Sequence, residues 1–171
     1  PGQESGNGLV DVLYGVSPSG RLPYTIAKKE SDYGTTIARG DDSNWDLFID
    51  YRRFDKHNIA PRFEFGFGLS YTNFTYSELI VTGQPSAGPA TGATGPGGPV
   101  DLFDTVATVT AKISNSGGVA GAEVPQLYLG YPSSTNSPPK QLRGFAKLKL
   151  EAGASGTATF KLRRRDLSYW D

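Results

Sequence analysis

Five aspartates between residues 41 and 55 make carboxylates the first candidates for chemistry in this sequence. They are Asp41, Asp42, Asp46, Asp50 and Asp55. Two carboxyl groups held about 5–9.5 Å apart can cleave a glycosidic bond by acid and base catalysis. The residues around these aspartates are polar, and no apolar segment beside them would build a catalytic pocket. We therefore expect solvated charges, or ion pairs with nearby arginines (Arg52, Arg53 and Arg62).

Metal and cofactor sites are the next candidates, and the residue types argue against both. Asp41, Asp42 and Ser43 offer oxygen ligands for Ca²⁺, but their spacing does not match an EF-hand loop. The chain has no cysteine and a single histidine, which excludes disulfides, thiolate sites and multi-histidine sites. The Gly66-Phe67-Gly68 string is too short for a phosphate-binding fingerprint. We therefore predict no metal site and no cofactor.

The histidine and the two tryptophans complete the set of candidates. His57 could act as a general base, but Lys56 and Asn58 flank it and no nucleophile is near in the sequence. We expect a surface or structural role for it. Trp45 and Trp170 could stack on sugar rings, whereas filling the core is the more ordinary role of aromatic residues in a chain poor in aliphatic ones.

The charge balance restricts the class of partner. The chain has 17 Lys and Arg against 17 Asp and Glu, so its formal net charge is zero. Nucleic acids and anionic membranes attract proteins through excess positive charge, which makes them poor candidates here. The run Arg163-Arg164-Arg165 is one possible polyanion site, but arginines at the end of a strand are usually a solvated edge.

Length and composition predict one domain rich in turns, or one domain with pieces of another. The 171 residues include 22 glycines and 12 prolines, and only 37% are hydrophobic. No apolar run approaches the ~18 residues that span a bilayer. The chain begins with Pro1-Gly2, without a start methionine or a signal peptide, so we expect a processed or excised portion of a protein.

The first part of the chain is predicted to hold a short α/β segment and then an irregular connection. Residues 4–14 predict a helix, because apolar side chains recur at i, i+4, and Gly15 is a plausible end. Residues 22–26 predict a brief strand. Residues 28–63 show no sustained period, and residues 64–71 place aromatics between glycines, which favours tight turns under an aromatic cluster.

The rest of the chain is predicted to be an antiparallel β-sandwich, because short alternating segments are separated by turn signals. In the clearest of them, Ala107, Val109, Ala111 and Ile113 face one way. The stretch 83–99 is almost wholly Gly, Pro, Ala, Thr and Ser, and we expect a flexible loop inserted between strands. The five predicted strands are residues 74–82, 105–114, 123–130, 144–150 and 156–163.

Asn73-Phe74-Thr75 is an N-glycosylation sequon, and it is the only one in the chain. It has a consequence only if the chain is secreted. It precedes the first strand of the predicted sandwich, where Tyr71 and Phe74 can turn inward while Asn73 points outward. We therefore predict an exposed, glycosylated Asn73.

Several strings, taken in order along the chain, resemble the C-terminal part of glycoside hydrolase family 3, specifically its fungal β-glucosidases. One string, Phe65-Gly66-Phe67-Gly68-Leu69-Ser70-Tyr71-Thr72, differs from the family's pattern by a single aromatic residue. The others are residues 1–7, 11–15, 18–23, 49–55, 123–128, 142–145 and 165–171.

The resemblance implies a division of the chain and a fold. Residues 1–27 would be the end of an α/β-sandwich domain, and residues 28–72 a linker. Residues 73–171 would be a fibronectin type III-like domain with the flexible loop 83–99 inside it. The expected fold class is therefore mainly β: an immunoglobulin-like antiparallel sandwich with a short N-terminal α/β segment and an irregular linker.

The resemblance also implies an activity for the parent protein and none for this chain. Family members are retaining hydrolases that release terminal β-linked glucose, with an Asp nucleophile on a first domain and a Glu acid/base in the second. Neither motif occurs here. Glu4 belongs to a different family string, so we assign no catalytic residue.

We therefore expect a secreted, extracellular structural portion that braces the catalytic domains of its parent, or that self-associates. A β-glucoside substrate would be reached only through that parent. The alternative is a stand-alone β-sandwich module that binds a carbohydrate or another protein.

Overall fold

The computed structural model describes residues 2–35, 46–85 and 87–169, and the chain divides into two compact units. The first unit contains the residues up to Gly20, together with Gly68–Pro125 and Phe145–Ser168. The second contains Arg21–Phe67 and Gln126–Gly144, with Tyr169. Both units are therefore assembled from segments that lie far apart in the sequence.

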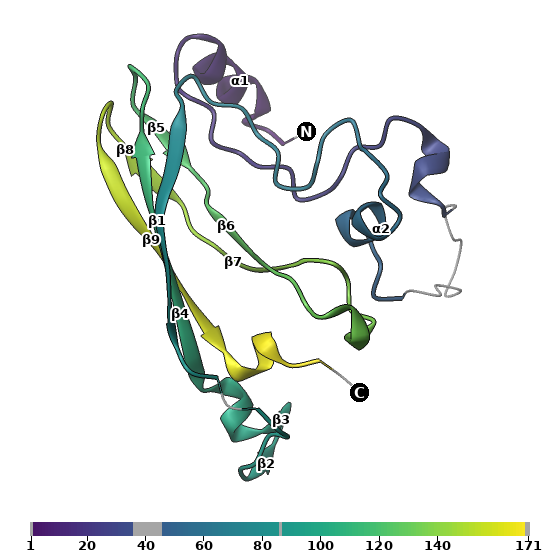
Figure 1. Ribbon diagram of the computed structural model, residues 1–171. Helices are drawn as coiled ribbons and strands as arrows, with labels where there is room; N and C mark the ends of the chain where they lie inside the picture. The colour runs from purple at the N-terminus through teal and green to yellow at the C-terminus, as the bar shows by residue number, and fades with distance from the viewer. Residues whose placement is uncertain (1, 36–45, 86, 170–171) are drawn as a thin grey trace. The chain divides into compact units, whose positions relative to one another are not determined.

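The first unit contains two antiparallel sheets that share one core (Figure 1). The larger sheet has the order β1 (Phe74–Gly83), β4 (Thr105–Asn115), β9 (Ser155–Arg163). The smaller one pairs β5 (Gly121–Glu123) with β8 (Leu148–Leu150). Ile113, Leu150 and Ala158 form the buried cluster that joins them. The predicted inward face of residues 107–113 is confirmed, because Ala107, Val109 and Ile113 are buried.

A buried asparagine closes the turn end of this core. Asn115 is only 1% exposed, and its Oδ1 accepts hydrogen bonds from Thr72 Oγ1 at 2.5 Å and from the Gly117 amide at 3.1 Å. Its Nδ2 donates to the carbonyls of Val119 and Leu150, at 2.8 and 3.2 Å. Such complete pairing offsets the cost of burying a polar amide.

The Gly/Pro-rich segment of the first unit contains two very short strands, β2 (Thr94–Gly95) and β3 (Gly98–Pro99). They are followed by the 3₁₀-helix η2 (Val100–Phe103). The flexibility predicted for residues 83–99 concerns motion, so it stays a prediction.

The N-terminal helix is confirmed as α1 (Ser5–Leu13). Glu4 precedes it and accepts a hydrogen bond from Asn7 Nδ2 at 2.6 Å. Gly15 follows with a φ of 118°, a left-handed conformation that favours glycine and ends the helix. Leu9, Val10 and Leu13 are all exposed, so the apolar stripe of this helix lies open.

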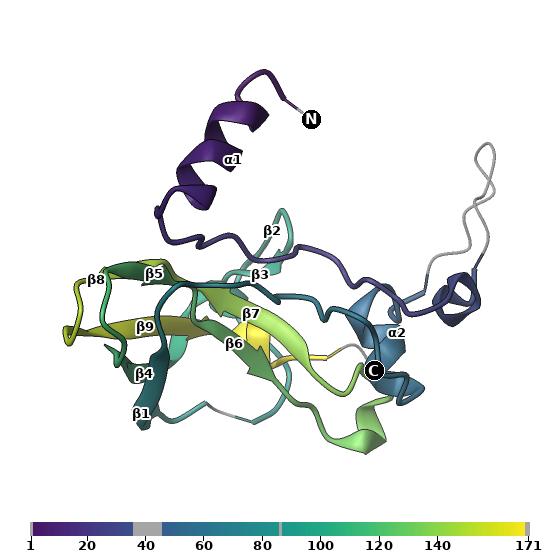
Figure 2. The same ribbon diagram turned by 90° about the horizontal axis from the view of Figure 1, so that it is seen from above.

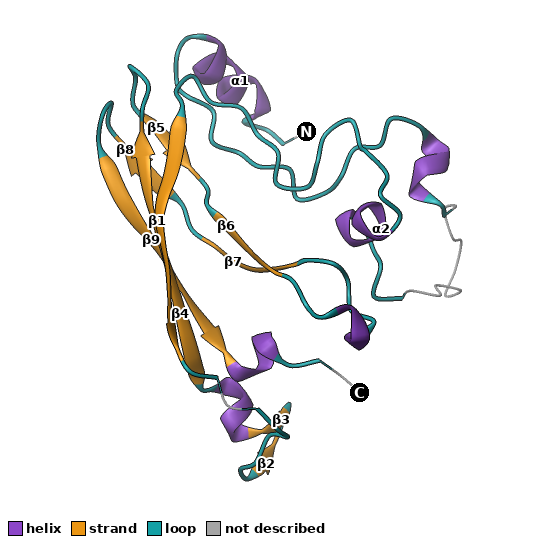
Figure 3. Cartoon of the chain, in the orientation of Figure 1, coloured by secondary structure: helices purple, strands orange, loops and turns teal. Residues whose placement is uncertain are grey.

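The second unit is mostly irregular backbone with short elements, as the colouring of Figure 3 shows. They are η1 (Glu30–Tyr33), α2 (Tyr51–Lys56), η3 (Ser133–Thr135) and the two-stranded sheet of β6 (Gln126–Leu129) with β7 (Gln141–Phe145). The remaining 3₁₀-helix, η4 (Arg164–Leu167), belongs to the first unit. This irregular backbone agrees with the sequence of residues 28–63, which shows no sustained helical or strand period.

The predicted strand at 22–26 is wrong as a regular element. The structure has only an isolated bridge between Ile26 and Phe63. Residues 21–27 nevertheless run beside residues 62–67, with the Leu22 amide donating to the Phe67 carbonyl at 2.8 Å. We call this pair of segments the linker ribbon. Pro23 has no N–H to donate, which prevents a continuous ladder.

Two predicted strands, 123–130 and 144–150, are each broken in two. The first becomes β5 and β6, separated at Val124-Pro125, and the second becomes β7 and β8, separated at Ala146-Lys147. In each case one piece belongs to the β5–β8 sheet and the other to the β6–β7 sheet, both visible in Figure 2. Proline cannot donate a ladder hydrogen bond, so Pro125 interrupts the first strand. The predicted class, mainly antiparallel β with a short N-terminal helix and an irregular linker, is confirmed.

Candidate functional site

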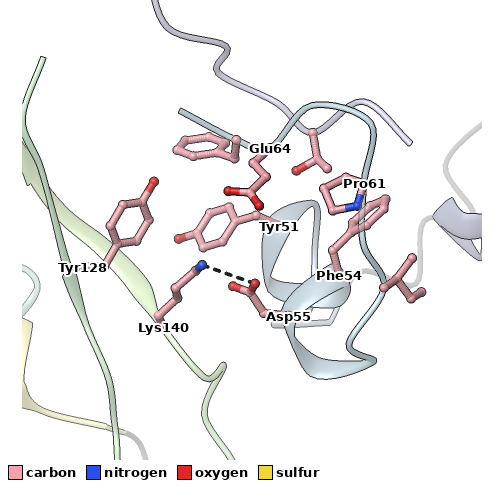
Figure 4. Close-up of a pocket in the computed structure, with 10 residues that line it drawn as sticks. Tyr51, Phe54, Asp55, Pro61, Glu64, Tyr128 and Lys140 are labelled. Carbon is pink, nitrogen blue, oxygen red and sulfur yellow. Dashed lines mark ion pairs between the residues drawn. The ribbon is translucent and has the colours of Figure 1, made fainter. Parts of the chain in front are cut away.

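A small cavity of about 50 Å³ lies within the second unit, between α2, the linker ribbon and the β6–β7 hairpin (Figure 4). Its walls are aromatic, and charged groups reach it from three segments. The lining residues are Thr25, Tyr51, Phe54, Asp55, Ile59, Pro61, Glu64, Phe65, Tyr128 and Lys140. Two of the five aspartates singled out in the sequence, Asp50 and Asp55, lie at or beside it.

Asp50 fixes the entry to α2. Its backbone has a φ of 52°, and its carboxylate accepts hydrogen bonds from the Thr25 amide at 2.8 Å, from Thr25 Oγ1 at 2.9 Å and from the Tyr51 amide at 2.6 Å. Thr25 is buried. This carboxylate therefore satisfies the start of a helix and a buried hydroxyl, and it is not available to a substrate.

Asp55 is paired across the cavity with Lys140, as the dashed line in Figure 4 shows. The distance from Lys140 Nζ to Asp55 Oδ1 is 3.4 Å. The other oxygen, Asp55 Oδ2, is buried and has no hydrogen-bond partner among the described residues. Because Lys140 is half exposed, we expect a contribution of roughly 0–1 kcal/mol from this pair.

Tyr128 forms the far wall and is kept neutral. Burial raises its pKa to about 12, and the nearby Tyr51, Asp55 and Glu64 add to the shift. Its hydroxyl donates to Gln126 Oε1 at 2.6 Å. A phenol with such a pKa is a hydrogen-bond donor near neutral pH rather than a base.

Aromatic contacts and single hydrogen bonds join the three segments. The Tyr51 ring packs against Phe65 at 4.7 Å and edge-on against Tyr128 at 5.9 Å between centroids. The Tyr51 hydroxyl accepts a hydrogen bond from the Leu142 amide at 2.9 Å. Gln126 Nε2 donates to the Gly66 carbonyl at 3.1 Å, where a φ of 81° and the close approach of the Gln126 side chain both require glycine.

The arrangement holds three segments together and offers little to a substrate. A pocket for a small ligand usually measures about 300–1,000 Å³, far above the size of this cavity. Its ionisable groups are the Asp55–Lys140 ion pair, the phenols of Tyr51 and Tyr128, and the exposed carboxylate of Glu64. No group of three or more His, Cys, Asp or Glu side chains able to hold a metal occurs in the part of the chain that the structure describes.

The other residues singled out in the sequence are spread over the chain. His57 is exposed at the C-terminal end of α2, and the Asp46 side chain accepts a hydrogen bond from the nearby Phe48 amide at 2.7 Å. Asn73 is exposed at the start of β1. Asp41, Asp42, Ser43, Trp45 and Trp170 lie outside the described residues.

The middle residue of the arginine run, Arg164, is engaged in contacts within the first unit, whereas Arg163 and Arg165 are exposed. Arg164 Nη1 lies 3.1 Å from Asp101 Oδ2, and Nη2 donates to the carbonyls of Gly88 and Pro89 at 2.9 and 2.8 Å. Asp101 Oδ2 also accepts from the Thr91 amide at 2.8 Å. No local pattern indicated the ion pairs Arg164–Asp101 and Lys140–Asp55, because the partners lie 63 and 85 residues apart in the sequence.

Two parts of the chain match models of known protein families. Residues 1–71 match the model of the glycosyl hydrolase family 3 C-terminal domain, and residues 123–171 match that of a fibronectin type III-like domain. Within the described residues, no helix is both long and apolar enough to cross a membrane.

Curated relatives agree with these models. Beta-glucosidase cel3A of Pyricularia oryzae is 67% identical over 99% of this chain, and probable beta-glucosidase L of Aspergillus terreus is 61% identical over all of it. The match covers 24% of each relative. The chain therefore spans about a quarter of the length of the curated relatives that it matches.

Solved structures agree as well. The beta-D-glucoside glucohydrolase from Trichoderma reesei matches all of this chain with 66% identity and a TM-score of 0.93, over 25% of its own length. Beta-glucosidase 3B from Thermotoga neapolitana matches 99% of the chain with 33% identity and a TM-score of 0.79, over 23% of its own length. The chain belongs to glycoside hydrolase family 3, and it is similar to a C-terminal part of the fungal β-glucosidases of that family.

Proposed function

We propose that this chain is a non-catalytic structural portion of a secreted fungal enzyme that hydrolyses terminal β-D-glucosyl residues. The single observation that carries this proposal is the match over 99% of the chain, at 67% identity, to a protein named a beta-glucosidase, of which it covers only 24%. The catalytic carboxylates of the resemblance would then lie in the part of the parent protein that precedes this sequence.

The site geometry supports a bracing role. Most aromatic and charged side chains at the cavity of the second unit contact other side chains of the same unit, through the Asp55–Lys140 ion pair, ring contacts and the Tyr128–Gln126 hydrogen bond. We keep the division into residues 1–27, 28–72 and 73–171 as a proposal, with the linker 28–72 as the segment that contacts the catalytic domains. Self-association is the expected behaviour of the chain when those domains are absent.

The test is an activity assay in two stages. The purified 171-residue chain should not hydrolyse an aryl β-glucoside, because a retaining glycosidase needs two carboxyl groups at the scissile bond. The upstream part of the Pyricularia relative should then bind the chain and gain thermal stability. Turnover by the isolated chain, or no interaction with the upstream part, would contradict the proposal.

Asn73 is proposed as a glycosylation site of the secreted protein. Its side chain is exposed, and its backbone carbonyl accepts a hydrogen bond from the Ser116 amide at 2.8 Å, which fixes the chain at this point. Chain made in a fungal secretory host should lose mass at Asn73 on treatment with an N-glycosidase. An unchanged mass would contradict this assignment.

A further inference from the structure

Three aromatic side chains of the linker ribbon are partly exposed. Tyr24 is 52% exposed, and Phe63 and Phe67 are each 39% exposed. Phe63 and Phe67 lie against each other, with centroids 5.0 Å apart and ring planes tilted by 40°. We call these three residues the aromatic trio. Phe65, between the two exposed phenylalanines, packs instead on Tyr51.

The backbone that carries the aromatic trio is held firmly. The Ile26 amide donates to the Phe63 carbonyl at 2.8 Å, and the Gly66 amide donates to the Leu22 carbonyl at 2.8 Å. The buried Thr25, bound to Asp50, lies directly beside Tyr24 in the chain. The backbone of the trio is therefore already ordered. Binding a partner would cost little conformational entropy in these three residues.

We propose that the aromatic trio is the surface on which the catalytic part of the parent polypeptide packs, through an apolar hollow that receives the Phe63–Phe67 pair. This inference rests on the proposed function and names the surface that the bracing role requires. Relatives are about four times as long as this chain, so most of such a polypeptide lies outside the structure. Aromatic anchors in apolar pockets dominate the energetics of protein interfaces.

A sugar is a poorer occupant. The tilted ring pair offers no single flat face, and phenylalanine provides no polar group to bind hydroxyls, as carbohydrate recognition requires.

The experiment measures binding of the full 171-residue chain to the upstream part of the Pyricularia relative. The double variant Phe63→Ser/Phe67→Ser is compared with Phe145→Ser, which removes a ring that is 72% exposed and lies in the first unit. We expect the dissociation constant to rise about tenfold or more for the double variant and to stay near the wild-type value for the control. Circular dichroism checks that both variants fold.

A second measurement needs no variant. Hydroxyl-radical footprinting of the wild-type chain should show Tyr24, Phe63 and Phe67 becoming protected when the upstream part is added, while Phe145 stays reactive.

If the wild-type chain binds but the trio keeps its reactivity and the folded double variant binds equally well, the inference is wrong and the proposed function stands. If the wild-type chain does not bind, the proposed function fails and the inference falls with it. Protection of the trio by a soluble β-glucan in place of the upstream part would also overturn the inference, in favour of carbohydrate binding.

Discussion

The two units of this chain differ in the interactions that stabilise each of them internally. The first unit depends on long backbone ladders and a buried apolar cluster, as in the pairing of β4 with both β1 and β9. The second has short elements, and side chains do most of the joining, through the Asp50–Thr25 contacts, the Tyr51 ring and the Gln126 amide. Substitution should therefore be costly at many positions of the first unit and at a few particular contacts of the second.

The largest effect is expected at Asn115 in the first unit. Asn115→Ala leaves the Thr72 hydroxyl, the Gly117 amide and two carbonyls without their partner in a buried place. We expect the free energy of unfolding to fall by about 2–4 kcal/mol. Urea denaturation of chain made in bacteria measures it, with the exposed Asn73→Ala as the control. A loss no greater than that of the control would show that the buried amide is dispensable.

Gly66 tests the second unit at one of its few essential contacts. A Cβ at this position would come within 2.2 Å of Gln126 Oε1, and the φ of 81° disfavours any other residue. We expect Gly66→Ala to cost about 1–3 kcal/mol. Gly118→Ala, where a Cβ would meet nothing within 4 Å, should be nearly neutral in the same denaturation experiment. Equal behaviour of the two variants would show that the contact between Gly66 and Gln126 is dispensable to the second unit.

Arg164 tests whether the Gly/Pro-rich segment behaves like the rest of the first unit. Arg164→Met removes the charge that binds Asp101 and the carbonyls of Gly88 and Pro89. We expect a modest loss of about 1 kcal/mol and faster amide hydrogen exchange at residues 88–98. Arg163→Met, on an exposed side chain, is the matched control. Exchange at 88–98 that is already fast in the wild type would confirm the flexible loop predicted from composition.

The smallest effect is expected at Tyr128, where the stability of the fold should depend on pH in the alkaline range. Its pKa in the folded chain, about 12, lies above the value of about 10 for an unfolded tyrosine. The neutral phenol therefore stabilises the fold fully below pH 10, and this contribution is lost as pH rises towards 12. The difference in melting temperature between wild type and Tyr128→Phe should shift in favour of the variant over this range. A difference that is constant with pH would contradict the raised pKa.

Sequence patterns predicted the first unit better than the second. The ranges of β1, β4 and β9 were predicted to within a residue. In β4 and β9 alternation works because one face of the strand faces the core, whereas β1 is exposed along almost its whole length. The breaks at Pro125 and Ala146 were missed, since alternation continues across them even though the chain changes partner there. The linker sequence has no sustained hydrophobic period from which elements could be predicted, because individual side chains make its contacts.

The same limit applies to the candidate site. The sequence suggested ion pairs between the aspartates and Arg52, Arg53 or Arg62, whereas in the structure Asp50 starts α2 and Asp55 pairs with a lysine. That lysine, Lys140, lies 85 positions further along the chain than Asp55, and nothing in its neighbourhood of Ser and Pro residues indicated it. The loop carrying Lys140 meets α2 only in the folded chain.

The interleaving of the two units has a consequence for how the chain folds as it is synthesised. The Tyr51 hydroxyl meets the Leu142 amide across 91 positions, and the first unit needs β9 before its larger sheet is complete. The described residues of the second unit are complete at Gly144 apart from Tyr169, whereas the first unit still needs Phe145–Ser168, so its larger sheet can close only after the second unit has been translated. Long-range closure of this kind slows folding and lengthens the time for which apolar surfaces are open to aggregation. A host that matures this protein would have to protect the apolar strands of the first unit until β8 and β9 emerge from the ribosome.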